Sequence, residues 1–133
     1  MSTEPLPYHL CCKALEHLYL KDSYVLNIST KSNSIFFDME FVLTEKHELY
    51  HFPRTGEQYC YRRGKLEFNS YKWSNLQLSN RPPSTDATGE KDYGNIDYFV
   101  KIKDGYFLEG DWGSLETNCE KIAVEYELDG ASS

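Results

Sequence analysis

The feature that most constrains the fold is a run of residues in which large apolar side chains occupy every second position. Between residues 35 and 44 these positions are Ile35, Phe37, Met39, Phe41 and Leu43. A β-strand points successive side chains to opposite faces, whereas a helix repeats about every 3.6 residues. The run therefore predicts a strand with one face on a core. Residues 24–30 predict an antiparallel partner with Leu26 and Ile28 inward, because residues 31–34 have turn composition.

The rest of the chain also favours strands. They are predicted at residues 59–68, 71–78, 96–102, 106–109 and 122–128. In the first of these, Gly64 marks a bulge or a bend. In residues 96–102 the alternation places Tyr98 on the same side as Ile96, and Asp104-Gly105 predicts the hairpin turn that follows. Residues 15–20 fit a strand, which we prefer, or a short helix.

These seven or eight short strands are joined mostly by hairpins, and no convincing helix accompanies them. We predict a single all-β antiparallel domain over residues 1–133, built as a sandwich or an open barrel. A chain of 133 residues is long enough to bury a core without a disulfide or a metal. Residues 1–10 and 129–133 are predicted to be flexible tails. Residues 79–94 contain few apolar side chains and form the longest predicted loop.

The chain is acidic, with 14 Lys and Arg residues against 21 Asp and Glu residues and a net charge of −7. Nucleic acids and anionic membranes both attract Lys and Arg, so neither is expected as a partner. No apolar run reaches the roughly 20 residues of a membrane-spanning helix. A basic partner protein fits the charge best. The alternative is that the negative charge simply keeps a small protein in solution.

The cellular compartment follows from the start of the chain and from the cysteines. Residues 1–7 have neither the basic nor the apolar region of a secretory signal, which predicts a cytoplasmic protein. In that compartment we expect reduced, buried thiols at Cys11, Cys12, Cys60 and Cys119.

Three segments carry a resemblance to a known group of proteins: GEQYCYRRGKLEF at residues 56–68, DYGNID at 92–97 and LEGDWG at 108–113. With DSYVL at 22–26 they resemble a family of small uncharacterised bacterial proteins, and the resemblance covers most of the chain. That family has no established activity, so the resemblance assigns no catalytic or binding residue. In size, charge and strand pattern the chain is also similar to small acidic β-rich immunity proteins that neutralise toxins.

Two groups of side chains have metal-binding chemistry. Calcium prefers oxygen ligands, which the acidic loop offers at Asp86, Thr88, Glu90, Asp92, Asn95 and Asp97. However, Lys91 and Asp97 stand where a calcium loop has its turn glycine and its bidentate Glu. Zinc prefers N and S ligands, and the candidates are His9, Cys11, Cys12 and His17, completed by Cys60 and Cys119. Adjacent cysteines on a strand point to opposite faces, so we predict no metal and no cofactor.

A nucleophile and its base could come from Cys60 with His47 and His51. No signature of a catalytic cysteine surrounds Cys60, and no G-x-S-x-G motif occurs in the sequence. Loop histidines are usually solvated, so we assign no catalytic residue.

The segments 93–97 and 110–113 are the most distinctive in the sequence. Paired glycines allow a tight bend, and Trp112 between them could anchor the core with its N–H bonded to a neighbouring Asp, which is the preferred interpretation. Alternatively, an exposed Trp112 beside carboxylates would bind a partner. Arg62 and Arg63 are adjacent on a predicted strand, so only one of the two side chains can face a core or cleft. We expect these arginines to pair with nearby acidic side chains of the chain itself, in preference to binding a carboxylate or phosphate of a ligand. The candidate partner-binding residues are Asp92, Tyr93, Asn95, Asp97, Asp111, Trp112 and Arg62.

These observations lead to three hypotheses about function. The first is a non-catalytic acidic protein-binding module, such as an immunity-type inhibitor of a basic partner. The second is a small hydrolase with a carboxylate or His site in the loops. The third is a β-barrel carrier whose Tyr and Phe side chains line a cavity for a small apolar ligand.

Overall fold

The computed structural model describes residues 6–53, 55–80, 82–85, 89 and 91–127. Within them the chain forms a one-turn helix, α1 (Tyr8–Cys11), and a 3-10 turn, η1 (Lys13–Leu15). The strands are β1 (Leu6–Pro7), β2 (Tyr24–Lys31), β3 (Ser34–Leu43), β4 (Cys60–Asn69), β5 (Ser74–Leu78), β6 (Ser84–Thr85), β7 (Lys91–Asp92), β8 (Ile96–Ile102), β9 (Gly105–Gly110), β10 (Gly113–Thr117) and β11 (Lys121–Tyr126). No helix in this part of the chain has the length and apolar character needed to cross a membrane.

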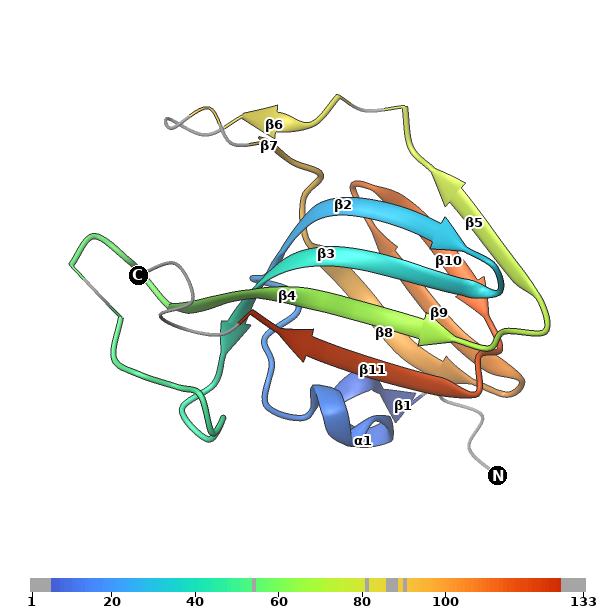
Figure 1. Cartoon of the computed structure of the whole chain (residues 1–133), viewed down its shortest axis with the longest axis horizontal. Helices are drawn as coiled ribbons and strands as arrows, with labels where there is room; N and C mark the ends of the chain where they lie inside the picture. The colour runs from blue at the N-terminus through green and yellow to red at the C-terminus, as the bar shows by residue number, and fades with distance from the viewer. Residues whose placement is uncertain (1–5, 54, 81, 86–88, 90, 128–133) are drawn as a thin grey trace.

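Two antiparallel sheets pack face to face, with α1 beside them (Figure 1). The five-stranded sheet has the order β1-β8-β9-β10-β5, and the four-stranded sheet has the order β11-β4-β3-β2. The short strands β6 and β7 form a separate ribbon. The prediction of an all-β antiparallel fold is confirmed, and of the two architectures the sandwich is the one observed.

The core lies between the sheets, and β3 supplies its centre. The alternation predicted for this strand is confirmed, because the buried side chains are Ile35, Phe37, Met39, Phe41 and Leu43. The Phe37 ring packs edge to face on Phe68 at 5.7 Å and on Trp112 at 5.0 Å between centroids. Leu108 and Leu115 of the five-stranded sheet belong to the same cluster. Burial of this apolar surface is the main force that holds the two sheets together.

A β-bulge in β2 changes which of its side chains face the core. The register with β3 shifts between Val25 and Asn27, and Leu26 is the extra residue. Val25 is therefore buried, whereas Leu26 is only half-buried. The prediction that Leu26 points inward is wrong, but Ile28 packs against the core as expected. A bulge leaves one residue without a cross-strand partner and shifts the alternation by one position.

A second bulge lies at the start of β8. The register with β9 shifts between Ile96 and Tyr98, and Asp97 is the extra residue. Phe99 is buried, while Tyr98 is 46% exposed. The predicted placement of Tyr98 on the inner side of the strand is therefore wrong, for the same reason as in β2.

Gly64 does not mark a bulge or a bend. β4 is one continuous strand, as predicted, and its register at Gly64 is unbroken on both sides, with Met39 and with Tyr126. A Cβ atom at residue 64 would overlap the carbonyl oxygen of Glu125 and lie 3.1 Å from the Phe41 ring. Close packing, and not a change of chain direction, requires glycine here.

Residues 15–20 do not form the strand that we preferred. The 3-10 turn η1 ends at Leu15, and Leu18 makes only an isolated bridge with Leu43. The Tyr8 hydroxyl donates to the carbonyl of Leu18 at 2.7 Å and accepts from the N–H of Leu20 at 3.2 Å. A side chain thus takes two of the backbone groups that a strand ladder would use.

The N-terminal residues 6–10 were predicted to belong to a tail. Instead, Leu6 and Pro7 pair with β8, and α1 follows at once, although no helix was expected. The Tyr8 ring also lies 5.9 Å from the Phe99 ring, which anchors this segment to the five-stranded sheet. Residues 1–5 and 128–133, including the predicted tail 129–133, lie outside the described residues.

The last third of the chain forms the predicted hairpins with small differences. The turn between β8 and β9 is Lys103-Asp104, one residue earlier than expected, because Gly105 already pairs with Ile102. Strand β10 was not predicted, and residues 71–73 lie outside β5. The predicted loop 79–94 contains the β6–β7 ribbon, and its residues 81, 86–88 and 90 lie outside the described part.

Candidate functional site

An acidic pocket opens on the outer face of the five-stranded sheet. Its volume is about 470 Å³, and its lining is Gln77, Leu78, Ser79, Asp97, Glu109, Gly110, Asp111, Gly113 and Ser114. Three carboxylates and no Lys or Arg occur among these lining residues. Asp97 reaches the pocket from the β8 bulge, Glu109 from β9 and Asp111 from the turn between β9 and β10.

The register of the sheet extends this acidic surface. Tyr98, Glu109, Ser114 and Gln77 stand opposite one another across β8, β9, β10 and β5. The neighbouring row of side chains on the same outer face contains Phe107 of β9, which stands opposite Glu116 of β10. The centroids of the Tyr98 and Phe107 rings lie 6.0 Å apart. We call this surface the acidic face, and its residues are Asp97, Tyr98, Phe107, Glu109, Asp111 and Glu116. Within the described residues, no ion pair forms to Asp97, Glu109 or Glu116.

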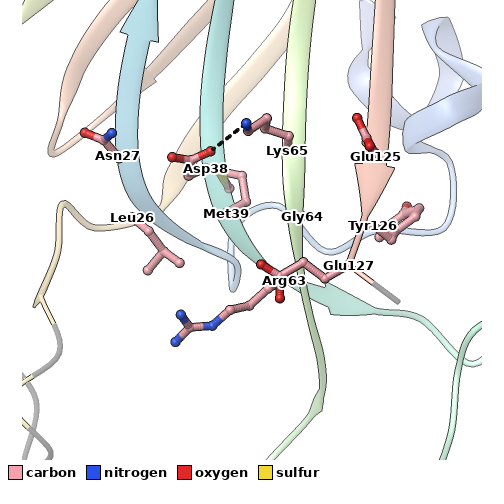
Figure 2. Close-up of a pocket in the computed structure, with 10 residues that line it drawn as sticks. All are labelled: Leu26, Asn27, Asp38, Met39, Arg63, Gly64, Lys65, Glu125, Tyr126 and Glu127. Atoms are coloured by element: carbon pink, nitrogen blue, oxygen red, sulfur yellow. Dashed lines mark ion pairs between the residues drawn. The ribbon is translucent and has the colours of Figure 1, made fainter. Parts of the chain in front are cut away.

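The outer face of the four-stranded sheet has a different charge pattern. A concavity of about 530 Å³ lies across its four strands, and Figure 2 shows side chains from each of them around it. Lys65 Nζ lies 4.0 Å from Asp38 Oδ1, and Arg63 Nε lies 3.5 Å from Glu40 Oε2. Acidic and basic side chains thus stand beside one another here, whereas the charged side chains among the described lining residues of the acidic pocket are all acidic.

Four of the seven predicted site residues gather at one corner of the sandwich. The Tyr93 N–H donates to the Val25 carbonyl, and the Asn95 amide donates to the Ser23 carbonyl at 2.6 Å. Asp92 Oδ1 accepts from the Gly94 N–H at 2.9 Å. These bonds fasten the segment 92–95 to the start of β2 and place Asp97 at the edge of the acidic pocket.

Asp111 lies beside this corner, because a Cβ atom at Gly94 would lie 2.9 Å from Asp111 Cβ. Gly94 also has a φ of +88°, a conformation that favours glycine. The sequence segments 92–97 and 108–113, which supply most of the predicted site residues, are therefore brought together. Ser79 Oγ donates to the Asp111 carbonyl at 2.6 Å and ties the turn to the end of β5.

Trp112 belongs to the core and not to the surface. It is 3% exposed and packs on Phe37, so the structural interpretation of this residue holds and the exposed one is wrong. The expected bond to an Asp is not found, since Nε1 has no hydrogen-bond partner among the described residues. A Cβ atom at Gly110 would lie 2.6 Å from Nε1, which explains why a glycine precedes the turn.

Arg62 lies apart from the other predicted residues. It is on β4 in the opposite sheet, and its Nη1 donates to the carbonyl of Glu127 at 2.9 Å. Its neighbour Arg63 pairs with Glu40. The expected pairing of these two arginines is thus found for Arg63, while Arg62 binds the main chain near the end of β11.

The candidate metal ligands are not assembled in the described part of the chain. No group of three or more His, Cys, Asp or Glu side chains there could hold a metal ion. Of the calcium candidates, Asp86, Thr88 and Glu90 lie outside the described residues. The three cysteines whose side chains are described, Cys12, Cys60 and Cys119, are buried and form no disulfide in that part of the chain, as expected. Burial raises the pKa of the Cys119 thiol to about 11, which makes it a poor nucleophile.

The histidines near Cys60 have structural partners. The Leu49 N–H donates to His47 Nδ1 at 3.0 Å, so the neutral ring carries its proton on Nε2 and donates to the Tyr126 hydroxyl at 2.9 Å. His51 Nδ1 lies 2.8 Å from the carbonyl oxygen of Phe52. The His51 main-chain N–H, and not its ring, is what faces Cys60 Sγ, at 3.5 Å.

The partly buried His47 ring is expected to make the free energy of unfolding depend on pH. Burial lowers the pKa of His47 from its usual 6.5. Because the unfolded chain then takes up the proton first, the stability due to neutral His47 is complete above about pH 6.5 and falls as the pH drops below it. We expect the free energy of unfolding to fall more steeply between about pH 7 and pH 5 in the parent chain than in His47→Gln. Urea denaturation at several pH values measures this, and equal slopes in the two proteins would contradict it.

A larger concavity, about 1170 Å³, runs between the N-terminal segment, the start of β8 and residues 43–53 and 58–60. Its lining mixes acids, bases and rings, including Glu16, Lys21, Tyr19 and Tyr59. It borders the core, because Leu18, Leu43 and Phe99 belong both to its lining and to the core cluster. Between the two sheets, the buried side chains of that cluster pack on one another.

Four residues of the acidic face were not among the predicted site residues: Tyr98, Phe107, Glu109 and Glu116. Glu109 lies inside the LEGDWG segment, and Glu116 alternates with Leu115 and Thr117. That alternation was a signal for strand β10 and its outward carboxylate. Comparison of the chain with protein families, with curated proteins and with solved structures gives no match.

Proposed function

We propose that this chain is a non-catalytic, acidic protein-binding module that holds a basic partner protein on the acidic face. The observation that carries the proposal is the contrast between the two outer faces. Among the described residues no ion pair forms to Asp97, Glu109 or Glu116, whereas the opposite sheet pairs Asp38 with Lys65 and Glu40 with Arg63. A surface on which these three carboxylates have no ion pair in the described part of the chain is suited to basic groups from outside.

A basic partner would complement this face in two ways. Its Lys and Arg side chains would meet Asp97, Glu109 and Glu116, and the opposite charges would speed association and disfavour acidic competitors. The exposed parts of Tyr98 and Phe107 would add apolar contact, since aromatic residues are enriched at interface centres. An immunity-type inhibitor, which covers the basic surface of a toxin, is the specific form of this function that we favour.

The proposal sets the interaction in the cytoplasm, where the buried thiols Cys12, Cys60 and Cys119 would stay reduced. The resemblance to small uncharacterised bacterial proteins agrees with a bacterial source and adds no activity. The hydrolase hypothesis has less support, because both histidines near Cys60 already bond to other groups. The carrier hypothesis has less support because side chains fill the interior.

The test compares two triple variants with the same change in charge. One neutralises the acidic face with Asp97→Asn, Glu109→Gln and Glu116→Gln. The matched control neutralises the four-stranded sheet with Asp38→Asn, Glu67→Gln and Glu125→Gln. The probe is a fluorescein-labelled peptide of alternating lysine and valine, whose binding is followed by fluorescence anisotropy in about 0.05 M salt.

We expect the acidic-face variant to bind this peptide at least about tenfold more weakly than the parent chain, and the control variant to stay within about twofold. Added salt should weaken the parent complex more than that of the acidic-face variant. Equal losses in the two variants would show that only net charge matters, and the proposed function would then be wrong.

A further inference from the structure

Strand β5 is a free edge of the five-stranded sheet (upper right in Figure 1). The Ser79 N–H donates to the Trp112 carbonyl, and the Asn118 N–H donates to the Trp73 carbonyl. Hydrogen-bonded pairs alternate in an antiparallel ladder, so the odd-numbered residues of β5 bond to β10. The backbone N–H and C=O groups of Ser74, Leu76 and Leu78 therefore point away from β10, and no described strand pairs with them.

The other three edges of the sandwich have protection that β5 lacks. β1 is two residues long and contains Pro7. The start of β2 is covered, because Val25 exchanges hydrogen bonds with Tyr93 and Gly94. β11 carries charged side chains such as Lys121 and Glu125. Edge strands usually have charges, prolines, bulges or covers that prevent further pairing.

The sequence of β5 is Ser-Asn-Leu-Gln-Leu, which has no charge and no proline, and its pairing with β10 has no register shift. Leu78 at its end is 59% exposed. A strand of this kind is a ready template for another strand.

This open edge borders the acidic face. Gln77 and Leu78 of β5 line the acidic pocket together with Asp97 and Glu109. Asn75 of β5 stands opposite Glu116 of β10. Neighbouring strands lie about 4.8 Å apart, so a strand added to β5 would be about 10 Å from β10. Long side chains on the outer face of the added strand and of β10 can lean toward each other over β5 and meet across that distance.

We propose that the partner binds by adding an extended basic segment as a further strand along β5, with its Lys or Arg side chains on the acidic face. This inference rests on the proposed function and specifies the form of its partner. The main chain of the segment bonds to Ser74, Leu76 and Leu78. Opposite residues in a ladder share a face, so the partner residues that bond to these three point to the core side, where Leu76 packs on the core cluster.

The partner residues opposite Asn75 and Gln77 point to the acidic face and have their N–H groups turned away from β5. The recognised segment therefore alternates basic and apolar residues, and only the apolar residues donate to β5. Charge argues against a second copy of this chain as the occupant. Antiparallel pairing of two β5 strands would extend one sheet with both acidic faces on the same side, and each chain has a net charge of −7.

The test uses the lysine–valine peptide in three forms: unmodified, N-methylated at every valine, and N-methylated at every lysine. An N-methyl group removes the donor and blocks pairing at that edge. We expect methylation of the valines to weaken binding to the parent chain at least about tenfold, and methylation of the lysines to change it less than about threefold. The two methylated peptides have the same composition and charge, so each is the control for the other.

A pair of protein variants tests the same edge from the other side. Leu78→Pro removes an N–H that points to the free edge and leaves the bonds to β10 in place, while Leu78→Ala removes only the side chain. We expect weaker binding in Leu78→Pro than in Leu78→Ala, with thermal denaturation confirming that both fold. The peptide series does not depend on either variant, so it decides the result if Leu78→Pro unfolds.

Three outcomes would overturn the inference. If both methylated peptides bind like the unmodified one while the acidic-face variant still loses affinity, edge pairing is wrong and the proposed function stands. If the unmodified peptide does not bind to the parent chain, the proposed function fails and this inference with it. If sedimentation shows a dimer that Leu78→Pro dissociates, the occupant of β5 is a second copy and not a basic partner.

Discussion

Replacement of Phe37 by alanine is expected to lower the free energy of unfolding by about 4 kcal/mol. Phe37 is fully buried and packs edge to face on Phe68 of β4 and on Trp112 of the turn between β9 and β10. The change removes the buried ring and leaves a cavity that both rings line, because a packed core relaxes only in part. A domain of this size has a total stability of about 5–15 kcal/mol, so the variant is expected to unfold at a much lower urea concentration.

Phe52→Ala is the matched control for Phe37→Ala. Phe52 is 85% exposed, so the same chemical change removes almost no buried surface. We expect its free energy of unfolding to stay within about 0.5 kcal/mol of that of the parent chain. Similar losses in Phe37→Ala and Phe52→Ala, measured by urea denaturation, would contradict the assignment of Phe37 to the centre of the core.

Gly64→Ala is expected to cost about 3 kcal/mol, at the upper end of the range for overpacking. The added methyl group would overlap the Glu125 carbonyl oxygen and lie 3.1 Å from the Phe41 ring. The carbonyl belongs to the neighbouring strand β11, so relief requires the two strands to move apart. A flexible side chain could turn aside at little cost, but a strand held by its ladder cannot.

The exposed neighbour Lys65 supplies the comparison for Gly64. Lys65→Ala removes a surface ion pair with Asp38, and such pairs contribute at most about 1 kcal/mol. The midpoint of urea denaturation should therefore fall clearly in Gly64→Ala and only slightly in Lys65→Ala. A Gly64→Ala protein as stable as the parent chain would show that β4 and β11 are not tightly packed at this position.

The periodic parts of the fold could be predicted from the sequence, and the bulges could not. The alternation in residues 35–43 gave the orientation of β3 correctly, because a single buried face selects the same residue type at every second position. Leu26 and Tyr98 were misplaced because the extra residue of a bulge is defined by its lack of a cross-strand partner. Whether a residue has such a partner depends on the neighbouring strand, and the local pattern of apolar residues does not show it.

The candidate site was predictable to a similar extent. Asp97 and Asp111 stand in unusual segments of the sequence, and the structure brings those segments together. Glu116 reaches the same face only through its pairing opposite Phe107, a relation between two strands that no single segment contains. Trp112 could be read either as an anchor or as a contact residue, and its burial depends on where Phe37 lies. Pairing between strands, not residue type, decides these positions.

The pairing of β1 with β8 also bears on how the chain is made. Leu6 lies opposite Lys101, so β1 is synthesised well before the strand with which it pairs. Strand β11 docks on β4, which also lies far from it in the sequence. Contacts between residues so distant in sequence slow folding. Until β8 is synthesised, the Tyr8 ring lacks the Phe99 ring on which it packs, and apolar surface that is exposed in this way during folding favours association with other chains.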